Sequence, residues 1–327
     1  MKVYILTEAG SMYGYGHLVR CSSLYSELSG RGIDVELIIN GDHEAVEVVK
    51  NKKYRIVNWL SIDFLSQLLH GEVYTIVDSY LANFDIYHFI SAYTDKSLFI
   101  DDNMRLNYPK GIVVNPSIYG KELNYPKNTE IEYLLGPEYV ILRDSFLKSK
   151  REGTNNQVKE VLITLGGADI RNLTPKILTL FKKEYPYLIK NVVVGKGFTN
   201  IKDIENIDDQ NVTLYYNVDG NQMKDLMLKS DITITAAGQT IHELIKTETP
   251  FIPIQVIDNQ RNNVKAILTY NLVNRVLHSD DEDVMDKLSA EIKFLLHEEN
   301  RLFLINNLHG LIDGAGSARI VSKLLEE

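Results

Sequence analysis

The most constraining feature of this sequence is a unit at its amino end that predicts a β-strand, a glycine-containing loop and an α-helix in succession. Residues 3–6 form an apolar, partly β-branched run typical of a buried strand. The loop that follows carries Gly10, Gly14 and Gly16, and His17 stands where the helix should begin. Apolar residues then recur at helical spacing, at Leu18, Cys21, Leu24 and Leu28. Such an opening favours an α/β protein, because glycine permits the tight turn and the close approach of a ligand that these units use.

His17 is the first candidate for a chemical role. It is expected where the carboxyl edge of a sheet meets a helix N-terminus, which is the usual place for a ligand crevice in open α/β folds. The positive end of the helix dipole disfavours an imidazolium there, so we expect His17 to be neutral and able to act as a base near pH 7. The alternative is an ordinary turn with an incidental surface histidine, which composition alone would favour.

Polar side chains follow several of the next predicted strands. Strands are expected at 35–39, 54–57, 73–77, 97–100 and 112–114, and helices at 43–51, 61–69 (capped by Ser61) and 83–93. The residues that follow these strands include Asp78, Tyr80, Asp101, Asp102 and Asn115. Parallel strands end at one edge, so we expect these side chains to converge near the glycine loop, although Asp and Asn also favour turns for their own reasons. The pair of adjacent aspartates could hold Mg²⁺, but such pairs are more often structural, and no metal site is predicted.

A second unit of the same kind begins after the polar segment 148–157, which is typical of a linker. We therefore expect two domains, 1–150 and 151–327, with the last helix able to pack back on the first. Strands are predicted at 161–165, 191–194, 212–215, 232–235 and 251–254, and helices from about Asn172, at 219–229, 240–247, 260–270 and 282–297, and at the carboxyl end. The alternation implies two Rossmann-type parallel sheets covered by helices, whose carboxyl edges would face each other across a cleft.

The second domain carries a candidate site for a nucleotide. Gly166 and Gly167 lie at a predicted strand-to-helix turn, and a second small-residue turn consists of Ala237, Gly238, Gln239 and Thr240. Backbone N–H groups at such turns can bind phosphate, and Glu243, one turn into the next helix, could accept hydrogen bonds from ribose hydroxyls. Ordinary turns and a solvated carboxylate are the alternatives. No Walker-type lysine follows the glycines, which argues against phosphoryl transfer.

Composition narrows the classes of function. The formal net charge is −9 and 24% of residues are charged, so a broad basic surface for nucleic acid is not expected. One cysteine, Cys21, excludes an intramolecular disulfide and a cysteine-rich zinc site, and its position predicts a core residue. The first residues lack the pattern of a signal peptide, and no run approaches the roughly 20 apolar residues of a spanning helix. We expect a cytoplasmic protein, monomeric and without stable membrane insertion.

Several motifs taken together resemble a known family. They are G-Y-G-H-x-x-R-C from Gly14, D-S-Y from Asp78, F-I-D-D from Phe99, L-G-P-E-Y-x-x-L-R-x-x-F from Leu135 and L-G-G-A-D-x-x-N from Leu165. This combination resembles the UDP-2,4-diacetamido-2,4,6-trideoxy-β-L-altropyranose hydrolases of pseudaminic acid biosynthesis, which are relatives of the MurG-type glycosyltransferases with the two-domain GT-B fold. The resemblance extends from Val3 to about Lys265.

The resemblance implies a role for each matching residue. His17 would activate water; the substrate-binding residues would be Gly14, Gly16, Tyr80, Asn172 and Asn259. Gly166, Gly167, Gly238, Gln239 and Thr240 would meet the nucleotide, mainly its diphosphate, and Glu243 its ribose. Water would attack the anomeric carbon of the UDP-linked sugar with inversion and expel UDP, with no cofactor and no metal.

The sequence also departs from the family pattern near His17. Leu6 stands where the family often has arginine, Glu8 where it has aspartate, and Tyr13 where it has a small aliphatic residue. These departures leave the identity of the sugar open. A GT-B glycosyltransferase and a non-catalytic nucleotide-sugar-binding subunit are the alternatives. The absence of an obvious apolar and basic docking patch favours a hydrolase over a MurG-like transferase.

Overall fold

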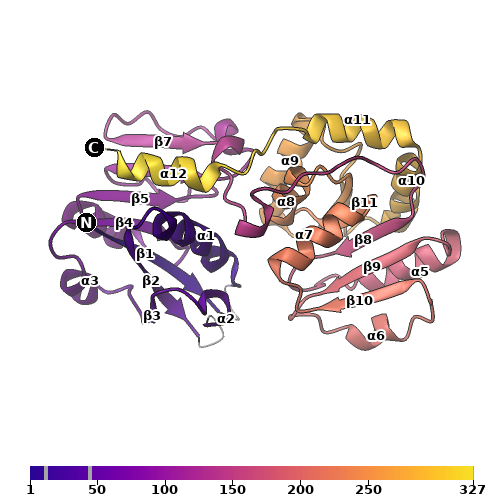
Figure 1. Ribbon diagram of the computed structural model, residues 1–327, viewed down its shortest axis with the longest axis horizontal. Coiled ribbons are helices and arrows are strands. Elements are labelled where there is room, and N and C mark those ends of the chain that lie inside the picture. Colours follow the sequence, from indigo (N-terminus) through magenta and orange to yellow (C-terminus); the bar gives the residue numbers. More distant parts are fainter. Residues whose placement is uncertain (11–13, 43–45, 327) are drawn as a thin grey trace. The chain divides into compact units, whose positions relative to one another are not determined.

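The computed structural model describes residues 1–10, 14–42 and 46–326, which form two compact units. Unit 1 comprises Met1–Leu147 together with Gly314–Glu327, and unit 2 comprises Lys148–Asp313. The carboxyl-terminal helix therefore belongs to unit 1, where it packs against the first helix of the chain (Figure 1).

Unit 1 is built on a seven-stranded parallel sheet in the order β3-β2-β1-β4-β5-β6-β7. Its strands are β1 (Lys2–Ala9), β2 (Asp34–Gly41), β3 (Tyr54–Ile56), β4 (Val73–Asp78), β5 (Lys96–Ile100), β6 (Gly111–Asn115) and β7 (Ile131–Leu135). Its helices are α1 (Gly16–Gly30), α2 (Val46–Val49), α3 (Ile62–Leu68), α4 (Phe84–Tyr93) and α12 (Gly316–Leu325), with short 3₁₀ turns at Gly120–Glu122, Pro137–Tyr139 and Asp144–Phe146. Strand β1 pairs with β2 on one side and β4 on the other, which makes the β1/β4 boundary the switch point where ligands bind in such sheets.

Alternation along β1 explains why both faces of this sheet are covered. Val3 and Ile5 belong to an apolar cluster with α1 and α12, whereas Tyr4 and Leu6 belong to a cluster with α3 and α4. Successive side chains of a strand point to opposite faces, so one apolar strand contributes to two layers of core. This double burial fixes the strand's register and hence the place of the residues that follow it.

Unit 2 repeats the plan with a six-stranded parallel sheet in the order β10-β9-β8-β11-β12-β13. Its strands are β8 (Glu160–Thr164), β9 (Ile189–Val194), β10 (Val212–Tyr216), β11 (Ile232–Ala236), β12 (Phe251–Gln255) and β13 (Leu277–His278). Its helices are α5 (Thr174–Glu184), α6 (Ile201–Glu205), α7 (Gly220–Lys229), α8 (Thr240–Lys246), α9 (Arg261–Thr269), α10 (Val284–Leu296) and α11 (Glu298–Leu308), with a 3₁₀ turn at Asp258–Gln260. The switch point here lies between β8 and β11.

Several details differ from the sequence prediction, among them the absence of α6 (Ile201–Glu205) from the predicted helices. The helix after Gly166-Gly167 begins at Thr174 rather than near Asn172, because the Asp169 carboxylate accepts from the N–H groups of Leu173 and Thr174 and caps it there. The helix predicted at 43–51 is described over Val46–Val49 and ends in a turn of polar residues. The two-residue strand β13 was not predicted, since so short a strand leaves no pattern.

The polar segment 148–157 is tied to unit 2 along its length. Arg151 donates to the backbone oxygens of Met227, Ser230 and Thr247 and to the Thr249 hydroxyl. Figure 1 shows the segment running past α7 and α8 on its way to β8. The segment predicted as a linker therefore belongs to unit 2 and is anchored to it by hydrogen bonds.

Candidate active site

The unit-1 switch point holds a histidine–aspartate pair in which the aspartate is buried and the histidine partly buried. His17, the second residue of α1, lies with Nδ1 2.7 Å from Oδ1 of Asp78, the last residue of β4. The side chain of His17 is 11% exposed and that of Asp78 1%. An ionised carboxylate can only accept, so the hydrogen must be on Nδ1, which leaves Nε2 as the acceptor of a proton from a ligand.

The electrostatics of His17 correct the prediction from the helix dipole. Burial of the ring lowers the pKa of His17, but the charge and hydrogen bond of Asp78 outweigh it and place the pKa above its ordinary value of 6.5. A full carboxylate charge at contact distance exceeds the partial charge of a helix end. His17 is therefore a stronger base than an isolated histidine rather than one held neutral.

Arg20 joins this pair to a second carboxylate. It lies one turn after His17 on α1 and donates to both oxygens of Asp78, at 2.5 and 2.6 Å. It also donates to both oxygens of Asp102, at 2.7 and 3.0 Å. Burial raises the pKa of both carboxyl groups, but the guanidinium holds each of them below its usual range. With a neutral His17 these side chains carry one net negative charge, and proton uptake by the ring removes it.

Tyr80 closes the cluster on its open side. Its hydroxyl donates to Asp102 Oδ2 at 2.7 Å, and its ring packs edge-on against His17 with centroids 4.6 Å apart and planes at 81°. The residue is nevertheless 46% exposed. A half-exposed aromatic ring beside the base is suited to contact a bound ligand.

The remaining strand-end residues, Asp101 and Asn115, form hydrogen bonds next to Asp102. Asp101 accepts from the Tyr125 hydroxyl at 2.8 Å, and the Asn115 amide donates to the backbone oxygen of Asp102 at 3.1 Å. The prediction that these residues converge with His17 is confirmed. Asp102 is engaged by Arg20 and Tyr80, and within the described residues no group of three or more His, Cys, Asp or Glu side chains could hold a metal ion.

The two described ends of the glycine loop before His17, Gly10 and Gly14, are hydrogen-bonded to each other. Gly10 and Gly14 exchange two backbone hydrogen bonds, of 2.7 and 3.2 Å, and Gly14 has φ +74°. An L-residue rarely adopts that conformation, so the turn favours glycine there. Gly14 and Gly16 are exposed, and Gly16 is the first residue of α1. Tyr13, the third departure from the family pattern, lies outside the described residues.

The predicted nucleotide residues of unit 2 follow neighbouring strands of one sheet edge. Gly166 (φ +86°) and Gly167 come after β8, and Gly195 after β9 approaches them so closely that a Cβ there would lie 2.5 Å from the Gly167 oxygen. The exposed Asn172 has φ +50° and accepts from the Asn200 amide at 2.6 Å. The turn geometry is thus fixed by backbone packing.

The turn between β11 and α8 is only partly available to a ligand. The Gly238 N–H donates to the Ala236 oxygen at 2.8 Å, so it is already bonded within the turn. Gln239 is exposed, and Thr240 and Glu243 are half-buried on α8. Asn259 is exposed in the 3₁₀ turn after β12. Arg171, which precedes Asn172, donates to the backbone oxygen of Val256 at 3.2 Å and so links the loop of Asn172 to the segment after β12 that carries Asn259.

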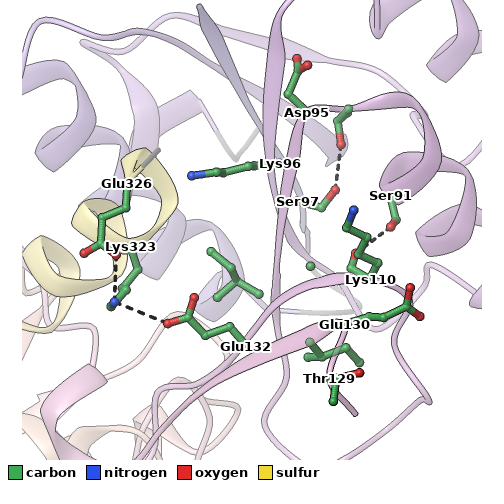
Figure 2. Close-up of a pocket in the computed structure, with 14 residues that line it drawn as sticks. Ser91, Asp95, Lys96, Ser97, Lys110, Thr129, Glu130, Glu132, Lys323 and Glu326 are labelled. Carbon is green, nitrogen blue, oxygen red and sulfur yellow. Dashed lines mark hydrogen bonds and ion pairs between the residues drawn. The ribbon is translucent and has the colours of Figure 1, made fainter.

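Unit 1 also contains a cavity of about 520 Å³ that is separate from the His17 cluster. Its lining includes Lys96, Gly111 and Ile131, which begin β5, β6 and β7, so it opens at the amino ends of the strands and not at the His17 edge. Figure 2 shows Lys323 of α12 between Glu132 and Glu326 at its rim, with both carboxylates within ion-pair distance. We do not assign the candidate site to this cavity.

Sequence reasoning missed Arg20, and it noted Glu8 only as a departure from the family pattern. The signal for Arg20 was present, since a residue three positions after His17 lies on the same helix face. The carboxylates that it joins are 58 and 82 positions away, and the fold alone brings them together.

Comparisons with known proteins give the fold and a set of distant relatives. No protein-family model matches the chain. An uncharacterized protein of Methanocaldococcus jannaschii is 30% identical over 282 residues, which are 80% of this chain and 57% of that protein. A Helicobacter pylori protein named pseudaminic acid cytidylyltransferase and UDP-2,4-diacetamido-2,4,6-trideoxy-beta-L-altropyranose hydrolase is 24% identical over 80% of this chain and 45% of its own length. The chain thus spans about half the length of these two relatives.

One further relative matches over nearly its whole length, and solved structures show the fold. The spore coat polysaccharide biosynthesis protein SpsG of Bacillus subtilis is 24% identical over 99% of this chain and 98% of its own. Among solved structures, MurG of Acinetobacter baumannii superposes with a TM-score of 0.67 at 14% identity and 99% coverage of both chains. The UDP-GlcNAc 2-epimerase of Neisseria meningitidis superposes with a TM-score of 0.65 at 15% identity over both complete chains. With its two parallel-sheet units, this chain has the GT-B fold of glycosyltransferases such as MurG, as predicted.

None of the helices in the described part of the chain combines the length and the apolar character that a membrane-spanning segment needs.

Proposed function

We propose that this protein hydrolyses a UDP-activated diacetamido-trideoxy sugar, releasing UDP and the free sugar in nonulosonic (pseudaminic) acid biosynthesis. The observation that carries the proposal is the His17–Asp78 pair at the β1/β4 switch point, with Nδ1 bonded to the carboxylate. The Helicobacter pylori relative, whose name includes this activity, supports the choice of substrate.

The chemistry needs one base and a good leaving group. Nε2 of His17 would take a proton from water as the water oxygen bonds to the anomeric carbon. The bond between that carbon and the diphosphate oxygen breaks, its electron pair leaves with UDP, and the configuration of the sugar inverts. Asp78 stabilises the imidazolium that forms, and the proton then passes to solvent.

Unit 2 would hold the nucleotide. We assign the diphosphate to the turns at Gly166-Gly167 and Gly238–Thr240, and the ribose to Glu243. Exposed amide side chains at Asn172 and Asn259 would hydrogen-bond the acetamido and hydroxyl groups of the sugar. Contacts to the nucleotide, remote from the reacting carbon, would contribute to orienting that carbon.

A second candidate is a GT-B glycosyltransferase, favoured by the structural likeness to MurG. The same histidine would then deprotonate an acceptor hydroxyl instead of water, so the base alone does not separate the two reactions. A nucleotide-sugar-binding subunit is a third candidate, against which the intact His17–Asp78 pair argues.

The test is release of UDP from a panel of UDP-linked 2-acetamido and 2,4-diacetamido sugars, without acceptor or added metal. We expect release from a 2,4-diacetamido-trideoxy sugar and inversion at the freed anomeric carbon. His17→Asn should lower the rate by about 10²–10⁴-fold while sparing UDP binding, because it removes the general base. His88→Asn, at an exposed histidine of the same unit, is the matched control.

Three outcomes would contradict the proposal. Full activity of the His17→Asn variant would show that His17 is not the base. Tight UDP binding with no release until an acceptor is added would replace hydrolysis by transfer. UDP-sugar binding without turnover under either condition would favour the binding subunit.

A further inference from the structure

The turn that carries Tyr80 is fixed through three of its backbone N–H groups, those of Tyr80, Leu81 and Ala82. The Tyr80 N–H donates to Glu8 Oε1 at 2.7 Å. The Leu81 N–H donates to Ser79 Oγ at 3.0 Å and to Glu8 Oε2 at 3.4 Å, and the Ala82 N–H donates to Ser79 Oγ at 3.0 Å. Ser79 Oγ itself donates to Glu8 Oε2 at 2.5 Å. One carboxylate and one hydroxyl therefore bind the turn from its inner side.

Carbonyl groups of the same turn are held from the other side. Arg105 Nη2 donates to the oxygens of Ser79 and Ala82, at 3.0 and 2.9 Å. The hydroxyl of the buried Tyr87 also donates to the Ser79 oxygen at 3.0 Å. A loop in which both donors and acceptors are satisfied by neighbouring elements has little freedom to move.

Glu8 is an unusual residue to bury at this place. It is 1% exposed near the end of β1, and its donors are two backbone N–H groups and the Ser79 hydroxyl rather than a cation. Burial of a carboxylate is unfavourable unless hydrogen bonds compensate for the lost water. The compensation here comes entirely from the turn at 79–82, so the position of the carboxylate and that of the turn depend on each other.

We propose that Glu8 is a positioning residue for the sugar site, acting through Tyr80; this rests on the proposed function. Glu8 fixes the backbone of Tyr80 while Asp102 fixes its hydroxyl, and between these anchors the exposed ring stands edge-on to His17. The Tyr80 ring is then held in a fixed position, where it would contact the sugar and orient its anomeric carbon relative to His17 Nε2. Misplacement of such a group by about 1 Å lowers rates by up to about 10²-fold.

Glutamine cannot replace Glu8 in this role. Both carboxylate oxygens accept from the turn. In one orientation of an amide its NH₂ group would face the Tyr80 N–H; in the other it would face the Leu81 N–H and a Ser79 hydroxyl oxygen that already accepts from two N–H groups. Aspartate is shorter by one methylene and cannot reach both sets of donors from the same strand position. Both variants should therefore release the turn without touching the base.

The first experiment compares Glu8→Gln with Glu36→Gln. Glu36 is a buried glutamate of β2 in the same unit, paired with Lys2 and Arg55, and controls for loss of a buried carboxylate. We expect Glu8→Gln to lower kcat/KM for the UDP-sugar by about 10–100-fold, with unchanged UDP affinity, and Glu36→Gln to leave kcat/KM near the wild-type value. In a protein that already carries Tyr80→Ala, Glu8→Gln should lower kcat/KM no further, because both substitutions act through the Tyr80 ring.

A second measurement does not depend on activity. Hydrogen exchange at the Tyr80 and Leu81 amides should accelerate in Glu8→Gln and not in Glu36→Gln. Unchanged exchange, or a loss of kcat/KM that adds fully to that of Tyr80→Ala, would overturn the positioning role. A wild-type protein that releases no UDP would refute the proposed function alone, since the exchange result would still decide whether Glu8 fixes the turn.

Discussion

Asp78→Asn is the substitution that tests the proposed base most directly. Asp78 accepts from His17 Nδ1 with one oxygen and from Arg20 with both. An asparagine keeps the shape but carries no charge, and it has a single accepting oxygen. If that oxygen turns to Arg20, the amide NH₂ faces His17 Nδ1 and favours the tautomer with hydrogen on Nε2, which cannot accept a proton.

The size of the effect follows from the geometry. A unit charge about 4 Å from another is worth about 4 kcal/mol at an effective dielectric constant of 20, so loss of the 2.7 Å contact removes several kcal/mol from the imidazolium. General-base catalysis contributes about 10²–10⁴-fold, which equals about 3–5 kcal/mol. We therefore expect kcat of Asp78→Asn to fall by about 10²–10⁴-fold while UDP affinity, which we assign to unit 2, is unchanged.

The pH profile of kcat/KM provides a second readout. The base works only when deprotonated, so the wild-type kcat/KM should rise with pH through the pKa of His17, which lies above 6.5. Without the Asp78 charge that pKa falls, so the rise in Asp78→Asn should occur at lower pH and reach a lower plateau. Asp63→Asn, at an exposed aspartate of unit 1, is the control. A plateau as high as that of the wild type, or a rise at an unchanged pH, would refute the assignment of Asp78.

Two further predictions concern the fold. Gly316→Ala should destabilise unit 1 by about 1–3 kcal/mol, since a Cβ there would lie 2.1 Å from the backbone oxygen of Val140. Gly153→Ala, where an added Cβ would contact nothing within 4 Å, should leave the stability unchanged. Thermal melts compare the two variants, and equal melting temperatures would contradict the close packing at Gly316. Arg151→Ala should lower the free energy of unfolding by about 2–3 kcal/mol, and with it the denaturant midpoint, because it leaves buried carbonyls of unit 2 without their donor. Lys150→Ala, at an exposed neighbour, should be neutral. An unchanged midpoint for Arg151→Ala would mean that these hydrogen bonds do not anchor the segment.

Much of the fold could be predicted because strand burial leaves a strong pattern. Runs such as 73–77 and 161–165 are apolar on both faces, and the polar or glycine-containing segments after them mark the carboxyl ends. The role of Arg151 could not be predicted, since its partners are mostly backbone oxygens that any sequence provides. Composition shows that a segment has no core residues, but not that one arginine holds it in place.

Most of the residues that form the candidate site could be predicted from the sequence, but their protonation states could not. His17, Asp78 and Tyr80 were found because each lies at or after the carboxyl end of a strand, and the sheet topology brings strand ends together. Their protonation depends on distances of less than 3 Å, which sequence does not contain. The helix-dipole argument gave the wrong direction for His17 because it counted the partial charge of a helix end and not the carboxylate in contact with the ring.

The buried charges explain how a raised pKa suits a base in this position. When His17 is neutral, Asp78, Asp102 and Arg20 carry one uncompensated negative charge, and accepting a proton from the nucleophile neutralises the cluster. Proton transfer is thus favoured by the same groups that hold the ring in place, and no second protein acid is needed when the leaving group is a diphosphate. An acceptor hydroxyl would be activated by the same transfer, so we expect the Asp78→Asn pH shift whether water or an acceptor is the nucleophile, and the panel without acceptor separates the two.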